Sequence, residues 1–154
     1  MVPLRLTSRV ARRLRSARGT ELIEFALVLP VLLCILGGIL DMGLAFNNYV
    51  AVTNAAREGA RVAAIPGWVE DDVKNRVKTY IEGAGLPASR VTTTAQRVPV
   101  TVGGRTINAV KVQVSYPYDY MILGPLIQMV GGTYATGLTL KAAATMRTEV
   151  ATGL

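Results

Sequence analysis

Two glutamates, Glu21 and Glu24, stand at the entrance of a long apolar run, where a charged side chain needs a chemical explanation. A carboxylate carried into a bilayer or a protein core is costly unless a cation or a hydrogen-bond donor meets it. Glu21 is explained by the first turn of a helix, whose dipole favours an acid. Glu24 lies deeper in the run, so it is the carboxylate that calls for a cationic partner.

Side chains suited to catalysis are scarce. The chain contains no histidine and a single cysteine, Cys34, which lies inside the apolar run. Ser-His and Cys-His nucleophile pairs are therefore excluded, together with the commonest transition-metal ligand. The acidic series Glu70–Asp72 is better explained as the start of a helix than as a cation site. We expect neither an enzyme nor a bound metal or cofactor.

The positive charge is confined to the first residues. The formal net charge is +7, from 17 basic and 10 acidic residues. Six basic residues precede Gly19 with no acid among them: Arg5, Arg9, Arg12, Arg13, Arg15 and Arg18. Removing these six from 17 leaves 11 basic residues against 10 acids, so the rest of the chain carries about +1. This near-neutral remainder argues against nucleic acid as a partner.

The apolar run is long enough to cross a membrane. From Phe25 to Phe46 it has 22 residues with one charge, Asp41, and a bilayer core needs roughly 20 residues of helix. Asp41 would then mark the outer boundary of the span, or would pair with a charge on another protein inside the membrane. Pro30 is tolerated in a membrane helix, and we expect a kink there.

The arginines set the orientation, because positive residues stay on the cytoplasmic side. We expect residues 1–19 to be a basic cytoplasmic leader, 20–46 a transmembrane helix, 47–65 an exported continuation of this helix and 66–154 an exported α+β domain. The chain would cross the inner (cytoplasmic) membrane once and contact its lipids. Its C-terminal domain would be periplasmic or extracellular.

Hydrophobic periods predict the elements. One helix runs from about Thr20 to Ala64, and its face of small residues would cover the protein's own sheet or another subunit's helix. A second helix occupies about residues 70–82. Alternation then predicts a hairpin around Gly103-Gly104, whose first strand is placed at an edge by Pro99, and a third strand over residues 138–150. The fold class is α+β: a long N-terminal helix, a second short helix and a small antiparallel sheet of about three strands.

The junction at the start of the apolar run resembles the processing site of type IV pilin precursors. A basic leader ends in Gly19, and Glu24 and Phe25 follow as the fifth and sixth residues after it. This block through LVLP, with NAAREGAR over residues 54–61, is more closely similar to the TadE-like family. That family comprises pseudopilins of tight-adherence (Flp-type) systems. The final TMRTE, residues 145–149, also resembles the C-terminal end of the family.

The resemblance implies a structural role with defined partners. A prepilin peptidase would cut between Gly19 and Thr20, where a glycine fits a protease cleft without a side-chain clash. In pilins, the glutamate that corresponds to Glu24 is thought to meet the free amine of a neighbouring subunit and so guide assembly. Otherwise Glu24 would stay ionised among lipid headgroups. The implied partners are the peptidase, other pilin-like subunits and inner-membrane pilus assembly proteins.

Several functions stay open beside the leading interpretation, a cleaved pseudopilin or minor pilin. A close variant is a main filament subunit of the pilus. A second class is a membrane-anchored binding module that keeps residues 1–19. A third is a secreted domain whose signal peptide ends at Gly43-Leu44-Ala45. The first residue of the mature chain separates these classes: Thr20 for a pilin, Met1 or Val2 for the anchored module, Phe46 for the secreted domain.

Overall fold

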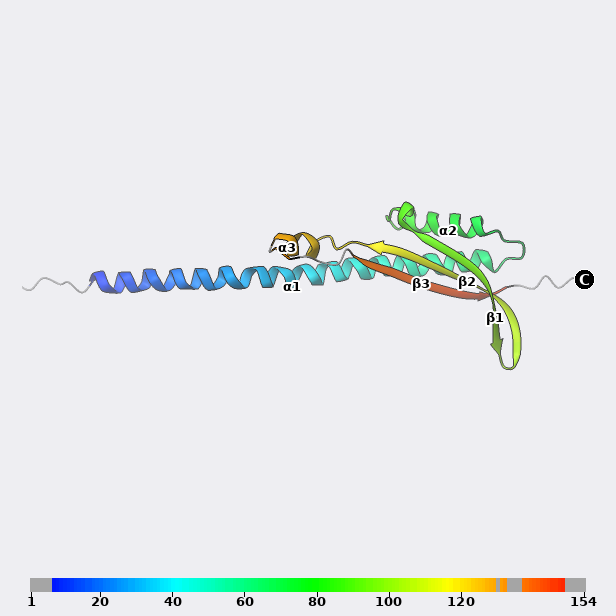
Figure 1. Ribbon diagram of the computed structural model, residues 1–154, viewed down its shortest axis with the longest axis horizontal. Helices are drawn as coiled ribbons and strands as arrows, with labels where there is room; N and C mark the ends of the chain where they lie inside the picture. Colours follow the sequence, from blue (N-terminus) through cyan, green and yellow to red (C-terminus); the bar gives the residue numbers. More distant parts are fainter. Residues whose placement is uncertain (1–6, 130, 133–136, 149–154) are drawn as a thin grey trace, which may run out of the picture. The chain divides into compact units, whose positions relative to one another are not determined.

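The computed structural model describes residues 7–129, 131–132 and 137–148 of the chain (Figure 1). The elements are α1 (Thr7–Ala63), α2 (Glu70–Gly83), a short 3₁₀ helix η1 (Ala88–Arg90), β1 (Thr92–Val102), β2 (Arg105–Tyr118), α3 (Leu123–Met129) and β3 (Leu138–Arg147). The three strands form one antiparallel sheet in the order β1-β2-β3. This arrangement confirms the expected α+β fold class.

The chain divides into two compact units, which we describe separately. The anchor unit comprises residues 1–40 and 121–134, and the sheet unit comprises residues 41–120 and 135–154. The anchor unit holds the first part of α1 together with α3. The sheet unit holds the last part of α1, α2 and all three strands.

Helix α1 begins at Thr7, earlier than the expected start near Thr20, and ends at Ala63 close to the expected end. Alanine, leucine and arginine, which are good helix formers, are frequent before Gly19 and extend the helix backwards. The helix also continues through Pro30, and the ribbon of the first part of α1 is drawn without a kink (Figure 1). The Gly19–Thr20 bond and the apolar run therefore belong to one helix.

The apolar run of α1 is exposed in the anchor unit. Its large apolar side chains between Leu22 and Leu40 include Leu27, which is 73% exposed, and Ile39, which is 63% exposed. The helix from Gly19 onward is long and apolar enough to cross a membrane. Apolar surface on this scale is unfavourable in water. A lipid environment removes that cost, so this part of α1 is suited to serve as a membrane anchor.

The sheet unit is built around one face of β2. Two helices and the central strand contribute most of its core. The core residues of these elements are Val52, Ala55, Ala56, Ala60 and Ala63 of α1, Val73, Val77 and Ile81 of α2, and Val110, Val112, Val114, Tyr116 and Tyr118 of β2. The small residues let the helices approach closely. A Cβ on Gly59 would lie 2.8 Å from Val77 Cγ2 and 3.2 Å from Val112 Cγ1. The face of small residues on α1 thus covers the protein's own sheet, which was one of the two alternatives expected for it.

Helix α2 matches its expected position, and only a narrow stripe of its surface is buried. It runs from Glu70 to Gly83 and carries three acids in its first turn. Val73, Val77 and Ile81 are buried, whereas the nearby apolar residues Val69 and Tyr80 are 59% and 37% exposed. The buried residues are limited to one line because α2 contacts the rest of the core along a single edge.

The hairpin extends well beyond the residues around Gly103-Gly104, and two valines of its first strand lie on the face of the sheet opposite the core. β1 begins at Thr92, and its polar first half is held by pairing with β2 rather than by apolar alternation. Pro99 lies on an edge strand, as predicted. Val98 and Val100 pair with Ala109 and Ile107, which alternate with the core residues of β2. They therefore lie on the opposite face of the sheet from the core.

The third strand confirms the predicted alternation up to Arg147. Residues 149–154 lie outside the described part of the chain, so the last residues of the predicted strand and of the TMRTE motif are not placed. The apolar segment before this strand contains α3, a helix that the sequence did not predict because Gly124-Pro125 interrupts the segment.

Candidate functional site

The Gly19–Thr20 bond lies inside α1, with Thr20 exposed. Among the residues that the structure describes, no atom lies within 4 Å of the place where a Cβ on Gly19 would stand, once its own helix backbone is set aside. Packing therefore does not require glycine here. Glycine weakens a helix by about 1 kcal/mol relative to alanine. The helix is consequently easier to open at this bond than at its neighbours.

Glu24 and Phe25 lie on α1 one turn further along. Glu24 is exposed and makes no hydrogen bond or ion pair with the side chains that the structure describes. Phe25 is 58% exposed. Residues four apart lie on the same face of a helix, so Glu24 stands directly beyond Thr20. The carboxylate is therefore available to a cation brought by another molecule.

Asp41 is buried in the sheet unit, with 1% of its surface exposed. The Tyr118 hydroxyl donates to the Asp41 carbonyl oxygen at 3.1 Å, and it lies 3.3 Å from Oδ1. Burial, followed by the charge of Asp41 and this hydrogen bond, raises the pKa of Tyr118 above its ordinary value. The phenol therefore stays a donor at neutral pH. The structure places Asp41 against the protein's own strand β2, a contact that its position in the sequence did not reveal.

Glu58 joins α1 to α2. Its carboxylate accepts hydrogen bonds from Arg61 Nη2 at 2.7 Å and Nε at 3.0 Å. It also accepts a bond from Arg76 Nε at 2.8 Å. The hydrogen bonds with Arg61 and Arg76 lower the pKa of Glu58 to about 2. Arg76 was missed because a contact between helices leaves no local spacing to recognise.

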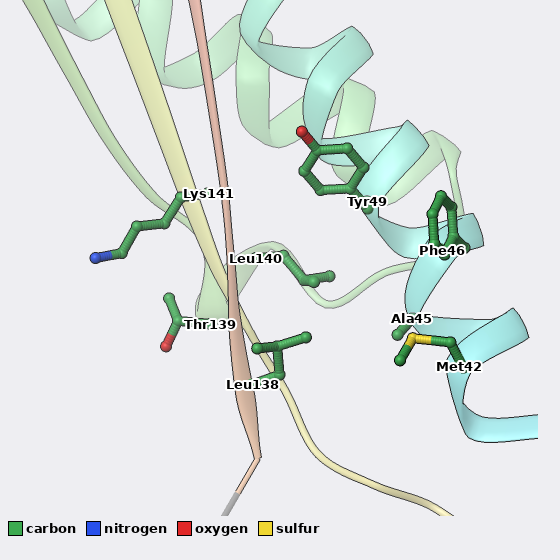
Figure 2. A pocket seen from close by; sticks show the side chains of 8 residues that line it. All are labelled: Met42, Ala45, Phe46, Tyr49, Leu138, Thr139, Leu140 and Lys141. Atoms are coloured by element: carbon green, nitrogen blue, oxygen red, sulfur yellow. The ribbon is translucent and has the colours of Figure 1, made fainter. Parts of the chain in front are cut away.

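A groove of about 410 Å³ lies between α1 and the start of β3 (Figure 2). It is lined by Met42, Ala45, Phe46, Tyr49, Leu138, Thr139, Leu140 and Lys141. Leu138 and Leu140 point toward the helix, whereas Thr139 and Lys141 point away from it (Figure 2). Phe46 is 65% exposed. The groove thus offers apolar contact surface and brings no acid, base and nucleophile together.

The predicted site residues do not form one cluster. Gly19, Thr20, Glu24 and Phe25 share one stretch of α1 in the anchor unit, whereas Asp41 is part of the sheet unit. The first four form a linear signal, which is readable from sequence because all its members are close along the chain. Asp41 acts within the fold, where it meets Tyr118, a residue 77 positions away.

The comparisons with known proteins match the linear signal. The family model of TadE-like proteins matches residues 19–61. The matched segment starts at Gly19, contains Glu24 and Asp41 and ends with the NAAREGAR stretch, so it bears out the resemblance to that family over these residues. Searches of curated proteins and of solved structures find no match.

Proposed function

From the TadE-like segment at residues 19–61, which marks a protein associated with tight-adherence (Flp-type) pili, we propose that this chain is a pseudopilin or minor pilin. A prepilin peptidase cuts it after Gly19, and it then acts structurally, not as an enzyme, in assembling a pilus or secretion apparatus. The observation that carries this proposal is that the family match starts at Gly19, the residue before the proposed cut.

The topology follows from charge. Six arginines before Gly19 keep the leader in the cytoplasm and bring the cutting site to the inner membrane surface. The exposed apolar part of α1 crosses the bilayer. The sheet unit is then exported, and the other assembly proteins of the inner membrane meet α1 within the bilayer.

Glu24 supplies the assembly contact. Cleavage leaves a cationic amine on Thr20, and a carboxylate near hydrocarbon is stabilised by such a partner. Glu24 is exposed in the single chain, so the amine of a neighbouring subunit can reach it. An ion pair at this level would fix the axial position of one α1 helix relative to the next.

The mature N-terminus tests the processing step. The protein is expressed with its native secretion machinery, purified from membranes and sequenced from its end by mass spectrometry. We expect Thr20 as the first residue. Met1 or Val2 would instead support an unprocessed anchored binding module, and Phe46 would support a secreted domain.

The role of Glu24 needs a separate test. In Glu24→Ala, we expect cleavage to continue and the number of assembled pili to fall, because the amine of the neighbouring subunit loses its partner. Glu21→Ala is the matched control, since Glu21 is an exposed acid three residues earlier on the same helix. Normal piliation of Glu24→Ala would contradict the assembly role. Counting this chain in purified filaments separates a minor from a main subunit.

A further inference from the structure

The segment between β2 and β3 is uncharged over a long distance. From Tyr120 to Leu140 the sequence has no acidic or basic residue. α3 lies in this segment, and it exposes large apolar side chains next to its ends: Met121 is 70% exposed and Met129 is 87% exposed. A solvated connection between two strands normally carries polar or charged residues. This composition therefore suits an apolar environment.

α3 packs on α1 within the anchor unit. A Cβ on Gly37 would lie 2.9 Å from Leu126 Cδ1 and 3.2 Å from Ile122 Cγ2. Gly38, the next residue, has no such neighbour within 4 Å. Because Gly37 has no side chain, α3 can pack closely against α1 at this position. The depth of Gly37 in a membrane would therefore also be the depth of α3.

Gly37 lies inside the apolar run. It precedes Asp41 by four residues, which is about 6 Å along a helix. Leu36 and Leu40, on either side of Gly37 along α1, are 49% and 57% exposed. A span of roughly 20 residues that starts near Leu22 reaches the neighbourhood of Asp41. A segment packed at Gly37 is therefore below the outer boundary of the hydrocarbon.

The backbone hydrogen bonds at the end of α3 suit an apolar environment. Lipid offers no hydrogen bonds, so polar backbone groups must be paired internally. Gly132 N–H donates to the Ile127 carbonyl at 2.9 Å, and Gly131 N–H donates to the Gln128 carbonyl at 3.0 Å. These bonds satisfy carbonyls at the end of the helix that a simple helix end would leave open.

We propose that α3 is a second membrane-contacting element, a short helix that lies in the outer leaflet beside α1 at Gly37 and is covered by phospholipid acyl chains. The proposal rests on the proposed membrane span of α1. Acyl chains are the occupant because α3 is continuous with the lipid-facing surface of α1 and its segment lacks any charge. The apolar surface of another protein is the alternative that the test must separate.

Quenching by lipid-borne nitroxides tests the contact. The full chain carries Trp68→Phe to remove its one tryptophan, and single tryptophans are then placed by Met129→Trp, Leu36→Trp or Thr101→Trp. Each protein is reconstituted in phosphatidylcholine and phosphatidylglycerol vesicles with a nitroxide near the headgroup end of the acyl chain. We expect Met129→Trp to lose roughly half its emission, as suits a helix at interfacial depth. Thr101→Trp, at an exposed position near the hairpin turn and far along the sheet from Asp41, should keep its emission.

Leu36→Trp distinguishes the two proposals. Quenching at Leu36 without quenching at Met129 would overturn the membrane contact of α3 and leave the span of α1 intact. In these vesicles the only protein that can cover α3 is a second copy of the chain, which would shield the tryptophan from the lipid and give this same outcome. Quenching at neither position would overturn the membrane span itself.

Cysteine labelling gives an independent measurement that leaves Trp68 in place. Cys34→Ala removes the native thiol, and Met129→Cys or Ser89→Cys introduces a new one. A membrane-impermeant maleimide is added from the outer side of intact membranes. We expect Met129→Cys to react only after detergent is added, whereas Ser89→Cys should react in both conditions. Equal labelling of both variants in intact membranes would contradict the proposal.

Discussion

Gly59 lies where α1, α2 and β2 pack closely together. The place of its missing Cβ is bounded by Val77 of α2 and Val112 of β2, both fully buried. Gly43, on the same helix, has no neighbour within 4 Å of the corresponding place. Close packing leaves no room for a side chain at Gly59, whereas nothing fills the corresponding space at Gly43. The two glycines of this helix therefore make a matched pair for mutation.

Gly59→Ala should destabilise the protein by about 1–3 kcal/mol, because the new methyl group overpacks a filled core. Gly43→Ala should be neutral or should stabilise the helix by up to about 1 kcal/mol, from helix propensity alone. Urea unfolding of the full chain in detergent, followed by circular dichroism, measures both. Equal effects of the two substitutions would show that the valines around Gly59 relax freely.

The Glu58 carboxylate should make stability depend on acid pH. Its pKa is about 2 in the folded protein and 4.5 as the ordinary value. A lowered pKa means that the stabilisation is present above about pH 4.5 and is lost as the pH falls toward 2. Because both arginines are substantially exposed, we expect Glu58→Gln to cost only about 1 kcal/mol at neutral pH. The measurement is the difference in unfolding free energy between wild type and Glu58→Gln from pH 7 to pH 2.

That difference should shrink through this window and should also fall in high salt. Glu82→Gln on α2 is the control, since Glu82 is exposed and has no ion pair within the described part of the chain. It should change stability by less than about 0.5 kcal/mol at every pH. A constant difference for Glu58→Gln over the whole range would rule out the carboxylate as the titrating group.

At the scale of elements, the sequence predicts what depends on local pattern. The acids that open α2, the glycine turn at Gly103-Gly104 and the edge position of Pro99 are local signals, and the structure has all of them. The first half of β1 carries no apolar alternation and exists because β2 pairs with it. α3 contains a Gly-Pro pair and forms where α1 offers Gly37. Neither cause is visible in a short window of sequence.

The candidate site divides in the same way. Gly19 and Glu24 are readable because they lie within six residues of one helix. The partners of Asp41 and Glu58 are not, since Tyr118 and Arg76 are brought to them by packing between different elements. The groove beside Phe46 likewise needs both α1 and β3.

The Tyr118 hydroxyl connects two elements, α1 and the end of β2. Tyr118→Phe should cost about 1–2 kcal/mol, because the buried Asp41 loses a donor. Since the pKa of Tyr118 is raised, this stabilisation is present below pH 10, the ordinary value, and is lost as the pH rises through the higher folded value. Urea unfolding of both proteins at neutral and alkaline pH measures the effect.

Tyr80→Phe is the matched control, because Tyr80 lies on the outer side of α2 and is 37% exposed. It should change stability by less than about 0.5 kcal/mol. If the two tyrosine substitutions cost the same, the hydrogen bond with Asp41 does not stabilise the fold.

At the scale of the whole molecule, processing should change the charge more than the mass. The full chain carries +7, and loss of its six leading arginines leaves about +1. A cut before Phe46 would also remove Glu21, Glu24 and Asp41, which leaves 11 basic residues against 7 acids, or +4. Denaturing isoelectric focusing of membrane protein should therefore show a strong shift to lower isoelectric point. The variant Gly19→Ala should keep the position of the full chain, and Gly38→Ala should focus with the processed form.

Helix α1 carries both the apolar segment suited to a membrane anchor and a central part of the core, with no loop between the two. From Asp41 to Ala63 it contains no proline. A pulling force on the membrane end therefore reaches the contacts of Val52, Ala56 and Gly59 through the covalent helix itself. Drawing the helix out of the bilayer would therefore also load the folded core, through contacts that include those around Gly59.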